Sequence, residues 1–262
     1  MIDVRRGRAL LALASLVLAG GALGAAGTAP GTEALDIRGQ AQILHTYGAR
    51  GGEPVIVSSG DGGWVHLGPH IAETLASHGF FVVGFDVRSY LARFTSTQAT
   101  LRPEDVPGDY QRLVDFAAHG TGKRPVLIGV SEGAGLSVLA AADPRLHAVA
   151  SGVVGVGLPA VNELGWRWRD SVIYLTHGVP NEPTFHTASI IGHVAPLPLA
   201  SIQSTLDEFV STAEEQDLVA RAGPPKRLWL VRASDHRFSD NLEEFDARLL
   251  EALTWIREQA AR

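Results

Sequence analysis

The amino-acid sequence predicts an α/β protein in which helices cover both faces of a mostly parallel central sheet and a short insertion forms a lid. Three observations support this fold class. Short apolar runs alternate with segments of helical periodicity along most of the chain, which is typical of parallel strands joined by helices. The 262 residues are 45% hydrophobic, which is sufficient for one large core. A Gly-x-Ser-x-Gly motif lies between an apolar run and a segment of small, helix-forming residues.

Seven apolar runs rich in β-branched or aromatic residues predict the strands. The first run contains a turn near Gly39, so it supplies one or two strands. In chain order the runs are Ala34–Tyr47, Pro54–Ser59, Phe80–Val87, Pro125–Val130, Ala148–Val156, Pro198–Ser204 and Arg227–Ala233.

Helices are predicted between these strands, where apolar residues recur at helical spacing or helix-forming residues dominate. Gly79 follows the first helix and suits a helix C-terminus. The predicted helices are Ile71–Ser77, Pro103–His119, Gly133–Ala142, Thr212–Ala222 and Leu242–Ala260.

Residues 158–197 interrupt the alternation of strands and helices. This segment contains several prolines and aromatic side chains, among them Trp166 and Phe185. We interpret it as an insertion or lid rather than a second domain. Its aromatic residues either line a substrate pocket or only pack the insertion onto the core, and the sequence leaves both alternatives open.

The N-terminal residues have the layout of a secretory signal peptide. Three arginines within the first eight residues precede the apolar stretch Ala9–Ala19, and small residues with cleavage options near Ala26 follow. The apolar stretch is short for a membrane span, and an uncleaved anchor is the alternative. We therefore expect a periplasmic or secreted protein divided into a signal peptide (1–26), a linker (27–33) and the α/β domain (34–262).

Charge and cysteine content limit the class of partner. The net charge is −6, from 22 basic and 28 acidic residues, and no run of Lys or Arg follows the first ten residues. A nucleic-acid partner is therefore not expected. The chain has no cysteine, which excludes disulfides and lipid attachment at a cysteine. His66 and His70 are four residues apart, but Gly68 and Pro69 between them disfavour a helical metal-binding pair.

The Gly129–Gly133 segment carries the strongest chemical signal. Its central residue, Ser131, follows an apolar strand and precedes a small-residue helix, which is the context of a nucleophile elbow. Small flanking residues allow the tight turn, and the helix N-terminus favours a developing negative charge. The alternative is an ordinary strand-to-helix turn with a capping serine.

A serine nucleophile requires a base and an acid that orients the base. His236 follows the last predicted strand, and Asp207 follows the strand that ends near Ser204. The chain order serine, acid, histidine is the order expected in this arrangement. Glu208 is the rival for the acid, and we interpret Asp235 as a turn residue.

An oxyanion hole requires two backbone N–H groups. The first is expected from Glu132, which follows the serine, and the second from Asp61 in a glycine-rich loop after an earlier strand. The glycines of this loop allow close approach of a substrate. The residues expected to contact substrate are Gly60, Gly62, Trp64, Trp166 and Phe185.

Three segments carry a resemblance to known proteins. They are Ser59–Trp64, Phe81–Asp86 and Leu127–Ala134. From about Val55 to Trp255 the chain resembles the α/β-hydrolase superfamily, and these segments look like the bacterial AcvB/VirJ virulence-protein family. The resemblance implies a periplasmic location and a serine-hydrolase fold. It also implies cleavage of the ester of aminoacylated phosphatidylglycerol.

The sequence therefore predicts a serine hydrolase that cleaves an ester through an acyl-enzyme intermediate, with no metal or organic cofactor. The expected substrate is a small-molecule or lipid ester, and a peripheral membrane contact is compatible with a lipid substrate. One alternative is a peptidase or thioesterase that uses the same three residues. A second, from another class, is a non-catalytic periplasmic binding protein of the VirJ type. The sequence does not indicate an oligomeric state.

Overall fold

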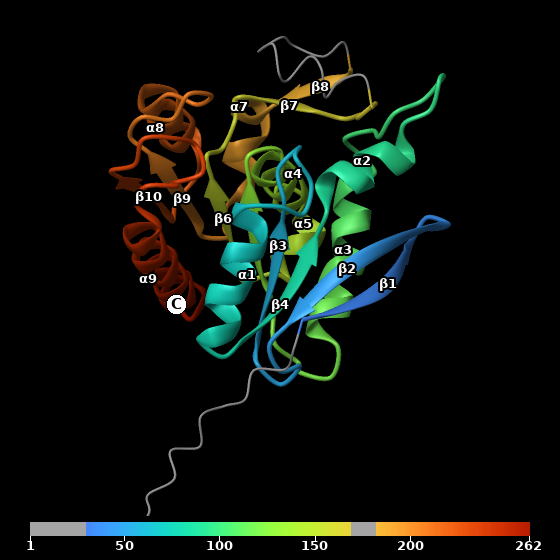
Figure 1. Ribbon diagram of the computed structural model, residues 1–262, viewed down its shortest axis with the longest axis horizontal. Helices are drawn as coiled ribbons and strands as arrows, with labels where there is room; N and C mark the ends of the chain where they lie inside the picture. Colours follow the sequence, from blue (N-terminus) through green and yellow to red (C-terminus); the bar gives the residue numbers. More distant parts are fainter. Residues whose placement is uncertain (1–29, 169–181) are drawn as a thin grey trace, which may run out of the picture.

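Eight strands form the central sheet of the protein (Figure 1), in a computed structural model that describes residues 30–168 and 182–262. The spatial order is β1-β2-β4-β3-β5-β6-β9-β10. β1 and β2 form an antiparallel hairpin, β2 is antiparallel to β4, and the other neighbours are parallel. The strands are β1 (Gly31–Ile37), β2 (Gln40–Tyr47), β3 (Glu53–Ser58), β4 (Phe80–Phe85), β5 (Val126–Val130), β6 (Gly152–Val156), β9 (Leu199–Ser204) and β10 (Lys226–Val231).

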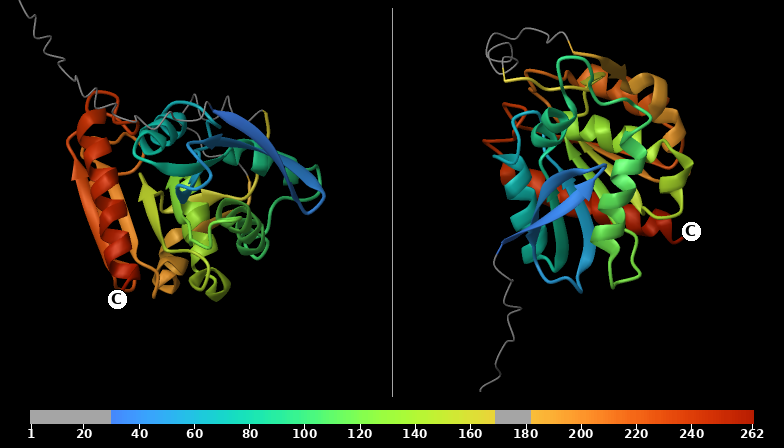
Figure 2. Two further views of the ribbon diagram at one scale, coloured as in Figure 1. Left: turned by 90° about the horizontal axis from the view of Figure 1, so that it is seen from below. Right: turned by 90° about the vertical axis from the view of Figure 1, so that its right-hand side faces the viewer.

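Helices cover both faces of the sheet. α1 (Leu67–Ser77) and α9 (Leu242–Ala260) pack on one face, and α9 lies along the β9–β10 end (Figure 2). The opposite face is covered by α2 (Val87–Phe94), α3 (Val106–Ala118), α4 (Glu132–Ala141), α5 (Pro144–His147) and α8 (Thr212–Arg221). The predicted fold class, a mostly parallel central sheet with helices on both faces, is confirmed.

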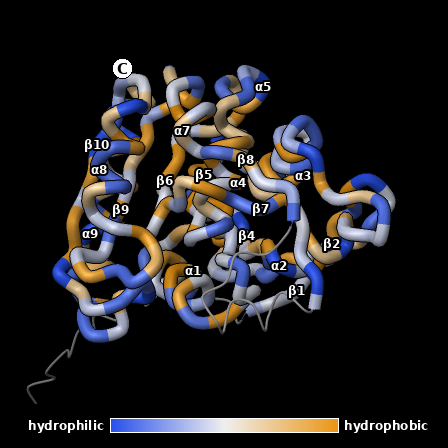
Figure 3. Tube along the Cα trace, turned by 90° about the horizontal axis from the view of Figure 1, so that it is seen from above, coloured by the Kyte–Doolittle hydropathy of each residue, from blue (hydrophilic) through white to orange (hydrophobic). Residues whose placement is uncertain are grey.

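Alternating side chains in each strand supply the two halves of the core. In β3, Ile56 faces the α3 and α4 side, whereas Val55 and Val57 face α1. Strands that are buried on both faces consist of continuous apolar residues, which is why β3 to β6 can be predicted from the sequence. Hydrophobic positions accordingly recur along the central strands and the helices beside them (Figure 3).

The expected insertion forms a small structure of its own. β7 (Val161–Glu163) and β8 (Thr184–His186) make a two-stranded antiparallel sheet, followed by α7 (Thr187–Ile190) and the 3-10 helix η1 (Ile191–Val194). Residues 169–181 of the insertion, the predicted signal peptide and the first residues of the linker lie outside the described residues.

Several boundaries differ from the sequence-based expectation. β1 begins at Gly31, within the expected linker, because its first residues pair with the end of β2. α1 begins at Leu67, with Pro69 in the first turn, where proline's missing N–H is tolerated. β6 begins at Gly152, because the first residues of the expected strand form the turn that ends α5, where Val149 and Ala150 N–H donate to Leu146 O. α2 is not among the helices expected from the sequence, although Asp86 is a recognisable N-cap that accepts from Ser89 N–H at 2.9 Å.

Candidate active site

Ser131 stands at a sharp turn between β5 and α4. Its φ of 50° and ψ of −119° are rare for a residue with a side chain, as expected for a strained elbow. The turn has no room for larger neighbours, because a Cβ at Gly129 would lie 2.2 Å from Gly133 O and one at Gly133 would lie 2.3 Å from Ser59 O. Ser131 itself is half-buried. The sequence motif therefore adopts the backbone that the elbow interpretation requires.

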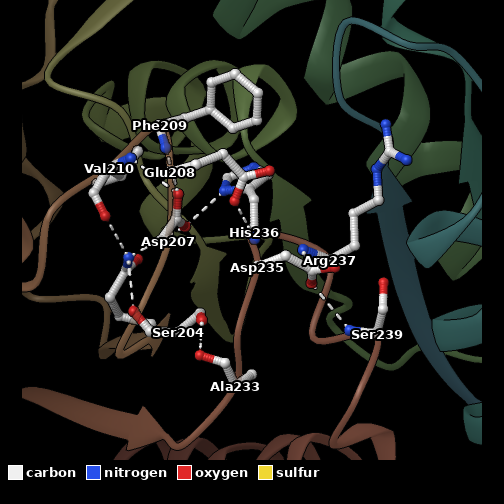
Figure 4. Close-up of polar contacts among 11 residues, drawn as sticks. Ser204, Asp207, Glu208, Phe209, Val210, Ala233, Asp235, His236, Arg237 and Ser239 are labelled. Atoms are coloured by element: carbon white, nitrogen blue, oxygen red, sulfur yellow. Dashed lines mark hydrogen bonds and ion pairs between the residues drawn. The ribbon is translucent and has the colours of Figure 1, made fainter.

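Asp207 and His236 come from neighbouring loops after β9 and β10 and meet side chain to side chain (Figure 4). His236 Nδ1 lies 2.6 Å from Asp207 Oδ2, and both side chains are buried. The other ring nitrogen, Nε2, is buried and has no hydrogen-bond partner among the described residues. The imidazole is thus held through one nitrogen, and the second is available to another group.

Four donors surround the Asp207 carboxyl group. Besides His236, the backbone N–H groups of Phe209 and Val210 donate to Oδ1 at 2.8 and 2.9 Å, and Gln203 Nε2 donates to Oδ2 at 3.1 Å. Burial by itself raises the pKa of Asp207, but the hydrogen bond and charge of His236, together with the two N–H groups, outweigh it and lower the pKa. Asp207 is therefore ionised at neutral pH. Gln203 is not among the site residues expected from the sequence, because no local motif marks it.

Ser131 and His236 both lie against the end of β6. The Ser131 N–H donates to Val156 O at 2.8 Å. The next residue, Gly157, has a φ of +58°, and a Cβ there would lie 2.4 Å from His236 Cε1 and 3.4 Å from Nε2. One short segment of backbone therefore contacts both the elbow and the imidazole.

The two rival acids have other partners. Glu208 Oε2 accepts from the backbone N–H of His236 at 2.8 Å, not from its ring. Asp235 Oδ1 accepts from the N–H groups of Arg237 and Ser239 at 3.0 and 2.9 Å, as a turn residue does. Of the three carboxylates, Asp207 is the one that contacts the imidazole.

The two predicted oxyanion residues, Glu132 at the start of α4 and Asp61 in the loop after β3, lie close to Ser131. A Cβ at Gly60, the residue before Asp61, would lie 3.4 Å from Ser131 Cβ. Glu132 is the first residue of α4, where the backbone N–H has no acceptor within the helix. The Glu132 side chain is buried, and its Oε1 accepts from the N–H of Glu163 on β7. Burial raises its pKa well above the usual value, as do the nearby carboxylates of Glu163 and Asp61, against the lowering effect of that hydrogen bond.

The aromatic residues predicted to contact substrate are engaged in packing. Trp64 stacks on His45 with ring centres 5.0 Å apart, and its Nε1 donates to Tyr47 Oη at 3.2 Å. Phe185 is buried in the core, and Trp166 is partly buried against the same cluster. These contacts favour the packing interpretation of the aromatic residues. Gly62, also predicted to contact substrate, is exposed in the same loop as Trp64.

Two surface hollows of about 420 and 450 Å³ lie at the opposite edge of the sheet, where Arg50 and His119 line both. They are not associated with the loops that carry Ser131 and His236. In the described part of the chain, no group of three or more acidic or histidine side chains is placed to hold a metal ion. Within the same ranges, no helix combines the length and apolar composition needed to cross a bilayer.

Solved structures with the same fold are numerous. The α/β hydrolase GrgF from Penicillium sp. sh18 superposes with a TM-score of 0.64 and 13% identity, covering 89% of this chain and 99% of GrgF. A bromoperoxidase from Bacillus anthracis gives 0.63 and 14%, covering 86% and 100%. A membrane phospholipase A, described as a novel bacterial virulence factor, gives 0.62 and 13%, covering 87% of each chain. At these identities the likeness establishes the fold alone.

The comparison of sequences is more specific. No curated protein matches the chain. The sequence profile of the family described as bacterial virulence protein (VirJ) matches residues 53–256, which include the Ser131 elbow and the Asp207 and His236 loops. The resemblance predicted from the three short motifs is confirmed, and the chain belongs to the VirJ family of bacterial virulence proteins.

Proposed function

We propose that this protein is a serine hydrolase that cleaves a carboxylic ester through an acyl-enzyme intermediate, with Ser131, His236 and Asp207 as its catalytic residues. The observation that carries the proposal is the Asp207–His236 pair, whose free Nε2 lies at the same end of β6 that anchors Ser131. A buried imidazole that is oriented through Nδ1 is the arrangement required of a general base.

In the first step the Ser131 hydroxyl oxygen attacks the ester carbonyl, and Nε2 of His236 takes the hydroxyl proton. The ionised Asp207 accepts the Nδ1–H and stabilises the imidazolium. The backbone N–H groups of Glu132 and Asp61 are proposed to bind the carbonyl oxygen as it becomes negative. His236 then gives its proton to the leaving alcohol, and the acyl group remains on Ser131.

In the second step a water molecule replaces the alcohol. His236 takes a proton from the water, whose oxygen attacks the acyl carbon, and the proton returns to Ser131 as the acid is released. The same three residues therefore act in both steps. Each proton that leaves Ser131 or water is transferred through Nε2 of His236.

For the substrate we propose aminoacylated phosphatidylglycerol, and for the location we propose the periplasm. The proposed substrate rests on what the resemblance to the AcvB/VirJ proteins implies. The proposed location rests on the signal-peptide layout of residues 1–26. A lipid ester would place the enzyme in peripheral contact with a membrane surface.

A substrate panel on the purified protein tests this function. We expect release of free amino acid from lysyl- or alanyl-phosphatidylglycerol in detergent micelles, and no release by Ser131→Ala. Ser239→Ala is the matched control, because Ser239 is an exposed serine in the His236 loop. Turnover of short p-nitrophenyl esters but not of the lipid would indicate that the substrate is a simple carboxylic ester. Turnover of peptides alone would indicate a peptide substrate. No turnover of any of them would favour a binding protein.

A further inference from the structure

A second buried carboxyl group lies near the Asp207–His236 pair. Glu215 is on α8, the helix that follows the Asp207 loop, and it is fully buried. Its Oε1 forms a hydrogen bond with Oγ of Ser201 on β9. The proposed mechanism does not use this group, so its burial requires another explanation.

The hydrogen bonds of Ser201 indicate the protonation state of Glu215. Ser201 Oγ contacts both the Glu215 carboxyl group and the carbonyl oxygen of Gly155, the latter at 3.4 Å. A serine hydroxyl has only one hydrogen to donate, although it can also accept. Both contacts are satisfied when Glu215 is protonated and donates to Ser201, because the serine hydrogen then serves Gly155. A carboxylate would leave one of them unsatisfied.

The surroundings of Glu215 favour the same state. Burial raises the pKa of Glu215 to about 8, against the lowering effect of the Ser201 hydrogen bond. Asp207, on the preceding loop, and Glu214, on the same helix, raise the pKa further through their negative charges, and the Leu158 N–H lowers it. The imidazole of His236 is already held by Asp207.

Glu215 is linked to the imidazole through the end of β6. The backbone N–H of Leu158 lies close enough to the carboxyl group to affect its pKa, and the residue before it, Gly157, is in contact with the His236 ring. Ser201 also stands opposite Gly155 in the pairing of β6 with β9. The carboxyl group is therefore linked to Gly155 through Ser201 and interacts with the N–H of Leu158, on the two sides of the residue that contacts His236.

We propose that Glu215 is a positioning residue: as a buried neutral acid it holds the end of β6, at Gly157 and Leu158, against the imidazole of His236. This inference rests on the proposed hydrolase function. When Glu215 loses its proton, Ser201 cannot satisfy both oxygens, and a second negative charge lies near Asp207. Catalytic activity is therefore expected to fall as the pH rises through about 8.

Kinetics of two Glu215 variants test the positioning role. In Glu215→Gln the amide can donate to Ser201 as the neutral acid does, and it does not titrate. We expect this variant to keep its activity at neutral pH but to lack the fall in kcat/KM, about tenfold per pH unit for a single ionisation, that the wild type shows above about pH 8. Glu215→Ala should lower kcat by about 10- to 100-fold through a displaced base. Asp217→Asn, an exposed carboxylate on the same helix, should behave as the wild type.

Urea unfolding as a function of pH tests the neutral acid without using catalysis. Between the ordinary pKa of 4.5 and about 8, Glu215 is protonated in the folded protein and ionised in the unfolded chain. Rising pH therefore favours unfolding, by up to about tenfold in the equilibrium constant per pH unit. Glu215→Gln removes this pH dependence. Glu132, whose pKa is also raised, contributes the same pH dependence to the stability of both proteins and therefore cancels in the comparison.

The outcomes separate the two proposals. Wild-type stability that declines from pH 5 to 8 relative to Glu215→Gln, together with a shifted alkaline limb of kcat/KM, is the expected result. Parallel stability curves, or identical pH–rate profiles in two active proteins, would overturn the role of Glu215 alone. Absence of Ser131-dependent hydrolysis in the wild type would instead overturn the proposed function.

Discussion

Gly157 supports the imidazole of His236 at a distance that excludes any side chain. A methyl group on Gly157 would lie 2.4 Å from Cε1, and the residue's φ of +58° adds strain for any other amino acid. Gly157→Ala should therefore displace the ring and lower kcat by about 100-fold, because misplacement of a reacting group by about 1 Å has that effect.

Steady-state kinetics and circular dichroism check this prediction. The matched control is Gly192→Ala, because the nearest atom to a Cβ at Gly192 is Arg221 O at 3.5 Å, an ordinary contact. A folded Gly157→Ala protein with wild-type kcat would be inconsistent with His236 as the base.

The adjacent carboxylates Asp207 and Glu208 should differ sharply in their effect on catalysis. Asp207→Asn removes the charge that holds the Nδ1–H and stabilises the imidazolium, and the loss of kcat could reach about 10⁴-fold. Glu208→Gln keeps an acceptor for the backbone N–H of His236 and should have a much smaller effect. Kinetics of the two variants at one pH make the comparison. A larger loss in Glu208→Gln would show that the acid is misassigned.

A substitution of Trp64 distinguishes a role in packing from a role in substrate contact. Its indole N–H donates to Tyr47 and its ring covers Gly84, where a Cβ would lie 2.2 Å from Cη2. Trp64→Phe should therefore lower the free energy of unfolding by about 1–3 kcal/mol, measured by urea denaturation. Trp168→Phe, at a residue that is 78% exposed, is the control and should change stability little. A rise in KM without loss of stability in Trp64→Phe would indicate contact with substrate instead.

Export should remove the N-terminal segment. We expect cleavage between roughly Gly24 and Ala29, after the apolar stretch that follows the three arginines. Mass spectrometry of the protein from a periplasmic fraction measures the new N-terminus. Intact Met1 in the inner-membrane fraction would favour the uncleaved anchor, and intact Met1 in the cytoplasm would rule out export.

The parts of the fold and site that the sequence predicts are the local ones. Ser131 is identified because the elbow occupies five consecutive residues, and the central strands because burial on both faces leaves an uninterrupted apolar run. α2 was missed because the expected strand was extended through Val87, past the cap at Asp86. The insertion could be recognised as a break in the alternation, but its pairing of β7 with β8 could not.

The remaining features depend on contacts between distant segments. Asp207 and Glu208 are neighbours in sequence, and only the direction of each side chain decides which one contacts the imidazole. Gln203 and Glu215 come next to the site through the packing of β9 and α8, and no motif marks either residue. Gly157 resembles many other glycines until His236, 79 residues later, is placed against it.

Covalent labelling shows whether Ser131 is a nucleophile that His236 activates. A fluorophosphonate reacts with a serine only when a base activates it, so the intact mass of the treated protein reports the nucleophile and the base together. The assignment of Ser131 and His236 predicts one adduct on the wild type, located at Ser131 by peptide mapping, and none on Ser131→Ala or His236→Ala, with Ser239→Ala labelled as the wild type. A folded wild-type protein that remains unlabelled, or an adduct on another serine, would contradict it.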